Sequence, residues 1–164
     1  MSTYVRLRAV PAPALRNSPA WLGRLFASDG ESLRHLVGRC PEGILDACCL
    51  DQERIYTSAP LEAPGGRLQA QVVLGGRPVF RNRSEPPLLV LTAAQTRRVA
   101  GFLEDADFDA LWDLARDRLL PGDGGMTAEA ETSHAFVVTH RALRAFYTHA
   151  AQWGAAVVKC CSEV

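Results

Sequence analysis

The sequence predicts an α+β fold in which a small mixed or antiparallel sheet, including both terminal strands, packs against several helices with a long C-terminal helix. Two observations carry this prediction. An alternating apolar pattern near the N-terminus and an apolar run near the C-terminus mark strands, and helical periodicity dominates the second half of the chain. The length of 164 residues suits one domain, which we expect to span residues 1–164.

The first quarter of the chain contains a strand signal followed by helix signals. In Thr3–Val10, apolar and polar residues alternate with period two, which indicates a half-buried strand. Ser18 followed by Pro19 is typical of a helix start, and this helix is expected to end at Asp29-Gly30. A second short helix is expected over Glu31–Arg39.

The middle of the chain is less clearly patterned. Residues 41–66 give no firm prediction, and Arg54–Ser58 fits either a strand or the end of a helix. Leu68–Leu74 has strand character and is interrupted by Gly75-Gly76, where a tight turn or bulge with positive φ is expected. A short strand over Arg77–Phe80 follows.

The second half of the chain carries strong helix-start signals. Thr92 and Asp107 are placed to cap helices, and the helix after Asp107 has an apolar stripe that includes Trp112. Gly154 is expected just beyond the end of the last helix. The predicted elements are, in order, a strand over Leu88–Leu91, helices over Ala93–Leu103, Phe108–Leu120 and His134–Trp153, and a strand over Ala155–Cys161.

The charge balance argues against electrostatic recruitment of a partner. The chain has 18 basic and 18 acidic side chains, and the two signs alternate locally as well as globally. We therefore expect no nucleic-acid partner and no membrane partner. Lys159 is the only lysine, which we interpret as a compositional bias towards arginine. The chain shows no secretory signal pattern and no long apolar run, so a cytoplasmic location is expected.

The five cysteines do not have the spacing of a metal site or a disulfide framework. Two pairs, Cys48-Cys49 and Cys160-Cys161, are adjacent in sequence, and adjacent strand residues point to opposite faces. We interpret these thiols as small buried apolar residues. Phosphate-binding, dinucleotide-binding and nucleophile-elbow patterns are also absent from the sequence, so no cofactor, metal ion or catalytic set is predicted.

One group of residues could form a site for a ligand or a partner. His140, Arg144 and Tyr147 follow one another at i, i+4 and i+7 on the last helix, and Arg77 lies beside the glycine turn. Such a patch could bind an anion or take part in acid–base chemistry, which would require a concave pocket. The alternative is a helix rim with a half-buried histidine and a solvated arginine.

The chain resembles the YfbM-like family, bacterial domains of unknown function. The residues that carry this resemblance span most of the chain and are Tyr4–Val10, Ala12–Phe26, Val73–Val79, 88–115 and 140–162. The resemblance implies an α+β domain and supplies no catalytic residue, and the cysteine doublets are not part of its pattern.

Two functions remain open on this basis. The first is a non-enzymatic protein-interaction or binding module with an unknown protein partner. The second is a small-ligand-binding protein or enzyme that uses a cleft between the C-terminal helix and the sheet. The sequence does not predict an oligomeric state.

Overall fold

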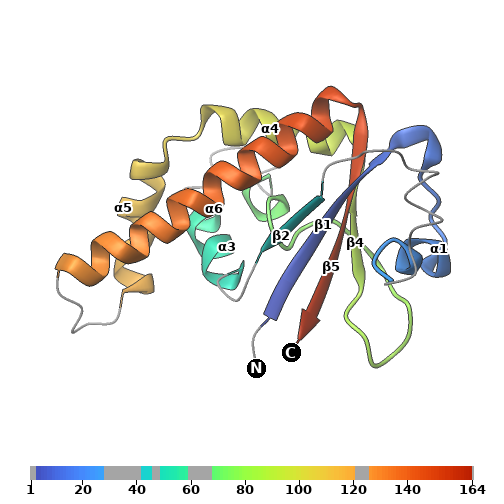
Figure 1. Ribbon diagram of the computed structural model, residues 1–164, viewed down its shortest axis with the longest axis horizontal. Helices are drawn as coiled ribbons and strands as arrows, with labels where there is room; N and C mark the ends of the chain where they lie inside the picture. The colour runs from blue at the N-terminus through green and yellow to red at the C-terminus, as the bar shows by residue number, and fades with distance from the viewer. Residues whose placement is uncertain (1–2, 28–41, 46–48, 59–67, 121–125, 164) are drawn as a thin grey trace.

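A computed structural model describes residues 3–27, 42–45, 49–58, 68–120 and 126–163. Its centre is an antiparallel five-stranded sheet with the order β2-β1-β5-β4-β3. The two terminal strands are adjacent in this sheet, so the predicted α+β class and the predicted terminal strands are confirmed (Figure 1). The strands are β1 (Thr3–Pro11), β2 (Glu42–Leu45), β3 (Arg77–Val79), β4 (Leu88–Leu91) and β5 (Ala155–Glu163).

The helices cover the two faces of the sheet unequally. The larger core lies under α3, α4, α5 and α6, whereas α1 covers a smaller core on the opposite face (Figure 1). Alternation along β1 explains the division, because Leu7 and Ala9 point into the larger core and Val10 into the smaller one. The helices are α1 (Pro19–Arg24), α3 (Cys49–Thr57), α4 (Ala93–Asp105), α5 (Phe108–Leu119) and α6 (Met126–Gln152).

The predicted caps are present. Ser18 and Asp107 accept hydrogen bonds from backbone N–H groups of α1 and α5, and Thr92 forms a reciprocal capping box with Gln95 at the start of α4. The apolar stripe of α5 faces the larger core, with Trp112 only 7 % exposed. Gly154, with a φ of 60°, forms the turn between α6 and β5.

Several predicted boundaries change. The last helix begins at Met126 instead of His134, and Arg54–Ser58 belongs to the end of α3 and the residue after it. The first helix ends at Arg24, and the helix expected over Glu31–Arg39 lies outside the described residues. The strand β2 lies within residues 41–66, the stretch that has no firm pattern.

The strand predicted over Leu68–Leu74 is wrong. This stretch forms a turn and a short 3-10 helix, η2 (Gln69–Gln71), with no ladder partner in the sheet. Its backbone polar groups bond instead to side chains from α3, α6 and β5, as described below, and those bonds replace the pairing that a strand needs.

The cysteines that the structure describes agree with the prediction of buried thiols. Cys49 and Cys160 are buried, and Cys161 is half-buried. Cys160 belongs to the smaller core and Cys161 packs against the larger one, so the adjacent pair points to opposite faces. Cys40 and Cys48 lie outside the described residues. Within the described part of the chain, no group of metal-ligating side chains is placed to hold an ion, and no helix could cross a membrane.

Candidate functional site

A cluster of polar side chains is buried between the sheet and the helices of the larger core. We call it the polar cluster; its members are Gln52, Glu53, Tyr56, His140, Tyr147 and Lys159. Three of them bond to the backbone of residues 68–76, which we call the clamped segment. Position 75 in this segment requires glycine, because a Cβ there would collide with the carbonyl oxygen of Ala70.

Lys159 is the central member of the polar cluster. It lies on β5 opposite Leu7, on the face of the larger core, and its side chain is fully buried. Its Nζ donates to the carbonyl oxygens of Gln71, Val72 and Gly75, the last two at 3.3 and 2.8 Å. An ammonium group has three N–H donors, so the clamped segment occupies all of them.

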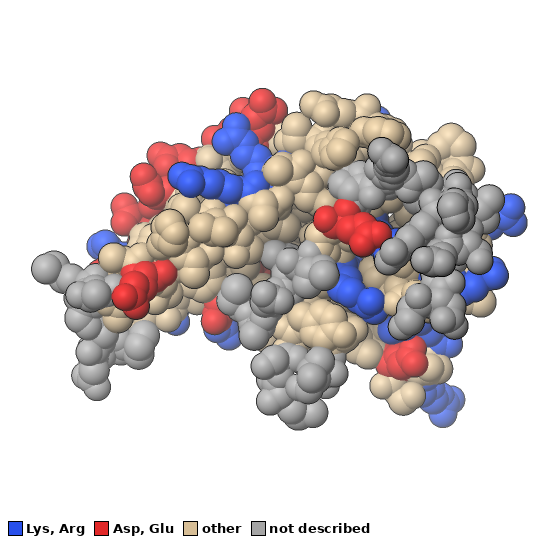
Figure 2. All heavy atoms as spheres, in the orientation of Figure 1, with Lys and Arg blue, Asp and Glu red and all other residues tan. Residues whose placement is uncertain are grey.

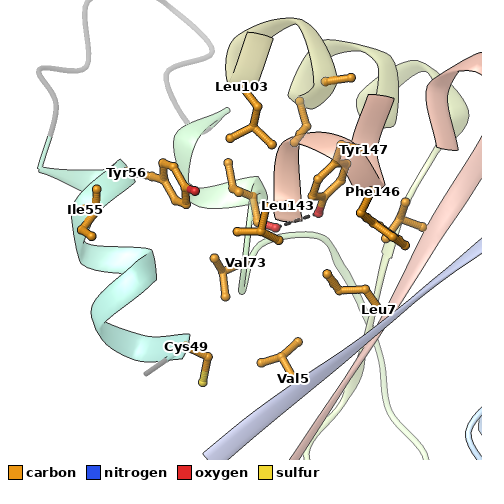
Figure 3. Packing of buried hydrophobic residues seen from close by; sticks show 14 of the residues in the cluster. Val5, Leu7, Cys49, Ile55, Tyr56, Val73, Leu103, Leu143, Phe146 and Tyr147 are labelled. Carbon is orange, nitrogen blue, oxygen red and sulfur yellow. Dashed lines mark hydrogen bonds between the residues drawn. The ribbon is translucent and has the colours of Figure 1, made fainter. Parts of the chain in front are cut away.

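Two further side chains hold the same segment. Tyr147 on α6 donates its hydroxyl proton to the carbonyl oxygen of Val72 at 2.7 Å (Figure 3). A side-chain oxygen of Glu53 on α3 accepts the backbone N–H of Leu74 at 3.3 Å. Together with Lys159, these residues bind both the carbonyl and the amide groups of a segment that has no strand partner.

Burial shifts the pKa values of Lys159, Glu53 and Tyr147. It lowers the pKa of Lys159 from 10.5 to about 7, an effect that the nearby Glu53 carboxylate opposes. Burial raises the pKa of Glu53 above 4.5, although the hydrogen bond from Leu74 and the positive charge of Lys159 act in the other direction. The pKa of the Tyr147 hydroxyl is raised well above 10 for the same reason of burial.

A second part of the polar cluster links α3 to α6. The hydroxyl group of Tyr56 lies 3.0 Å from His140 Nδ1 and accepts a hydrogen bond from Gln52 Nε2 at 3.0 Å. The three side chains thus form one chain of hydrogen bonds from Gln52 through Tyr56 to His140, which joins α3 to α6.

The environment of His140 favours its neutral form. Its ring contacts the rings of Tyr56 and Phe108, at centroid distances of 5.9 and 5.3 Å. Burial lowers its pKa below 6.5, and the charges of Arg144 and Arg141 lower it further. Since the unfolded chain binds a proton more readily, this group makes the fold less stable as the pH falls below about 6.5.

Three of the four predicted site residues lie on α6, as expected, and the fourth, Arg77, lies apart from them. His140 is only 5 % exposed, more buried than expected, and Tyr147 is fully buried with its hydroxyl group bonded to the chain. Arg144 is exposed one turn from His140. Arg77 lies on β3, where its guanidinium group donates to Asn17 near α1, on the other face of the sheet.

The sequence did not indicate the other members of the polar cluster. Lys159 and its carbonyl partners are 84–88 residues apart, and Tyr56 and His140 are 84 residues apart. One signal was available: the only lysine of the chain lies inside the apolar run of β5, where a solvated side chain is not expected.

Comparison with known proteins supports the fold and leaves the activity open. No family model and no curated protein matches the chain. The solved structure of YfbM from Escherichia coli, described as a protein of unknown function, is similar with a TM-score of 0.63 and 10 % sequence identity. The similarity covers 97 % of this chain and 99 % of that one. The resemblance to the YfbM-like family is thus confirmed at the level of the fold, which this chain shares with YfbM.

Proposed function

We propose that the protein is a non-enzymatic module that binds a protein partner. The proposal rests on one observation: the buried polar side chains form hydrogen bonds with the protein's own backbone. Lys159, Tyr147 and Glu53 each bond to the clamped segment, and a fully buried lysine whose Nζ lies among three backbone carbonyl oxygens is not in reach of a substrate. These groups serve the fold, which favours a function carried by the surface.

The outer face of α6 is the surface that we assign to the partner. Val138 is 52 % exposed at the centre of this face, and the exposed alanines Ala135, Ala142 and Ala145 lie within one or two turns of it. The spacing i, i+3, i+7 and i+10 places them along one side of the helix. We call this stripe the α6 face.

Charged residues border the α6 face. Arg141 and Arg144 are both exposed beside the stripe, close enough to His140 to lower its pKa. An apolar stripe with a polar border is typical of protein–protein contacts, in which arginine is a favoured residue. This gives the predicted candidate Arg144 a role at the border of the contact.

Replacing Val138 with aspartate is expected to reduce binding of the partner at least tenfold. A buried carboxylate in the centre of a contact has no matching charge, and tenfold corresponds to about 1.4 kcal/mol. The wild-type protein and the variant are immobilised, proteins of a lysate from the source cells are captured, and the affinity of the specific partner is then measured with purified protein.

Leu114→Asp is the matched control, because Leu114 is also 52 % exposed but lies on α5. It is expected to retain the partner. Equal loss of binding in both variants, or full binding by both, contradicts the assignment of the α6 face.

The Tyr56–His140 pair supports a second candidate, a small-ligand-binding protein or enzyme. The pair lies beside the positive charges of the exposed residues Arg141 and Arg144, which are suited to a small anion. This candidate predicts a metabolite that raises the Tm of the wild-type protein in a thermal-shift screen and has less effect on Arg144→Gln. A hit that stabilises both proteins equally contradicts binding at this position.

A further inference from the structure

A surface pocket lies on the face of the sheet opposite the polar cluster. It has a volume of about 450 Å³, which is within the range of small-ligand sites. The N-terminal part of α1 and the segment after β3 form its walls. We call it the α1 pocket; its lining residues are Ser18, Pro19, Ala20, Gly23 and Arg81.

Arg81 is the charged residue of this lining. Its side chain is 22 % exposed, and Nη2 donates to the carbonyl oxygen of Pro86 at 3.2 Å. Nε lies 3.2 Å from a carboxylate oxygen of Glu85 yet is buried without a hydrogen bond to any described residue. The guanidinium group has five N–H donors, and with Nε buried and one Nη2 proton bonded to Pro86, the other Nη protons remain for a ligand.

Two more arginines lie around the α1 pocket. Arg77 donates from Nη2 to Asn17 Oδ1 at 2.5 Å, and Asn17 directly precedes the lining residue Ser18. Arg24 is exposed one helical turn beyond the lining residue Ala20, on the same side of α1. In Figure 2, several basic side chains lie at the end of the molecule that carries α1, with acidic side chains among them.

The fold therefore creates a charge pattern that is not visible along the chain. The segments that hold Arg24 and Arg81 are far apart in sequence and come together only when α1 packs over β3 and β4. The one acidic partner that the structure describes for Arg81 is Glu85, whose side chain is 47 % exposed. The result is a pocket lined by one guanidinium group, with Arg24 and Arg77 nearby among the described residues.

We propose that the α1 pocket binds a small ligand that carries a phosphate group. A phosphate dianion offers several oxygen atoms in a tetrahedral arrangement, so it can accept more than one hydrogen bond from Arg81. The forked guanidinium group is well matched to phosphate oxygens, and such charge-assisted bonds are about twice as strong as neutral ones. This inference concerns a different face from the α6 face and does not depend on the proposed partner.

The proposal is tested by calorimetric titration with inorganic pyrophosphate at low salt. One saturable site is expected, and Arg81→Ala is expected to weaken binding at least tenfold because the central donors are lost. Gly23→Leu is expected to weaken it similarly without a change in charge. A Cβ at Gly23 has Arg81 Cδ as its nearest atom, at 3.8 Å, so a larger side chain fills the pocket.

Two further variants separate the site from general electrostatics. Arg98→Ala removes the same charge from an exposed position on α4, which packs on the opposite face, and is expected to leave binding unchanged. Glu85→Gln is expected to strengthen binding about two- to fivefold, because an exposed carboxylate no longer competes for Arg81.

Several outcomes would overturn the proposal. They are the absence of saturable binding, an effect of Arg98→Ala equal to that of Arg81→Ala, and unchanged binding by a Gly23→Leu variant whose circular dichroism spectrum is native. A parallel titration with succinate tests the ligand class, since a dicarboxylate bound as tightly as pyrophosphate would exclude specificity for phosphate.

Discussion

Replacing Lys159 with methionine is expected to lower the free energy of unfolding by about 3–5 kcal/mol. Methionine fills a similar volume but donates no hydrogen bonds. The carbonyl oxygens of Gln71 and Gly75 would lose their Nζ donor, and the carboxylate of Glu53 would lose its nearest described positive charge. Urea denaturation followed by circular dichroism measures this loss.

Tyr147→Phe is the graded control for this prediction. It removes one hydroxyl donor from Val72, whose carbonyl oxygen keeps the weaker bond from Lys159, so a loss of about 1 kcal/mol is expected. If Lys159→Met were neutral or stabilising, the desolvation of the lysine would outweigh its three hydrogen bonds, and the clamp would contribute nothing to stability.

The pH dependence of stability gives an independent measurement on the same variant. Burial lowers the pKa of Lys159 from its ordinary value of 10.5 to about 7 in the folded state. Between these values the unfolded chain binds a proton that the folded chain lacks, so this group makes the fold more stable as the pH rises. The slope is at most about 1.4 kcal/mol per pH unit. Comparing wild type with Lys159→Met at pH 7 and 8.5 measures this slope together with the change in the titration of Glu53 and Cys161, whose pKa values Lys159 lowers.

Local signals account for the parts of the fold that were predicted correctly. The helices α4 and α5 follow from the caps Thr92 and Asp107 and from periodic apolar faces, all within a few residues of sequence. The strands β1 and β5 follow from their own patterns, although nothing in either pattern indicated that they are neighbours. The pairing of β1 with β5 depends on the order of all strands in the sheet, so neither strand's own sequence indicates it.

The errors have a common physical cause, which is competition from distant side chains. The apolar stretch before Gly75 has the composition of a strand, but Lys159, Tyr147 and Glu53 bind its backbone groups from three other elements. Lys159, which the composition marks only as the single lysine, bonds to the backbone of this stretch. Arg77, expected near the last helix, lies on β3 and bonds to Asn17, which precedes a lining residue of the α1 pocket.

Trp112→Ala is expected to lower the free energy of unfolding by about 3–5 kcal/mol, as is typical of a large aromatic residue removed from a core. Trp112 is 7 % exposed and belongs to the larger core, and its ring centroid lies 5.9 Å from that of Phe136 on α6. Alanine leaves a cavity between α5 and α6 that the neighbouring side chains fill only in part. Chemical denaturation at a single pH, with tryptophan-independent detection by circular dichroism, gives the value.

Leu114→Ala provides the control on the same helix. Leu114 is 52 % exposed on the outer side of α5, so its truncation is expected to change stability by no more than about 0.5 kcal/mol. Leucine and alanine are both good helix formers, so Leu114→Ala changes the helix propensity of α5 very little. A cost below about 1 kcal/mol for Trp112→Ala would mean that α5 does not dock through this ring. If Trp112→Ala lowers the free energy of unfolding by about 3–5 kcal/mol and Leu114→Ala does not change it, the packed face between α5 and α6 stabilises the fold.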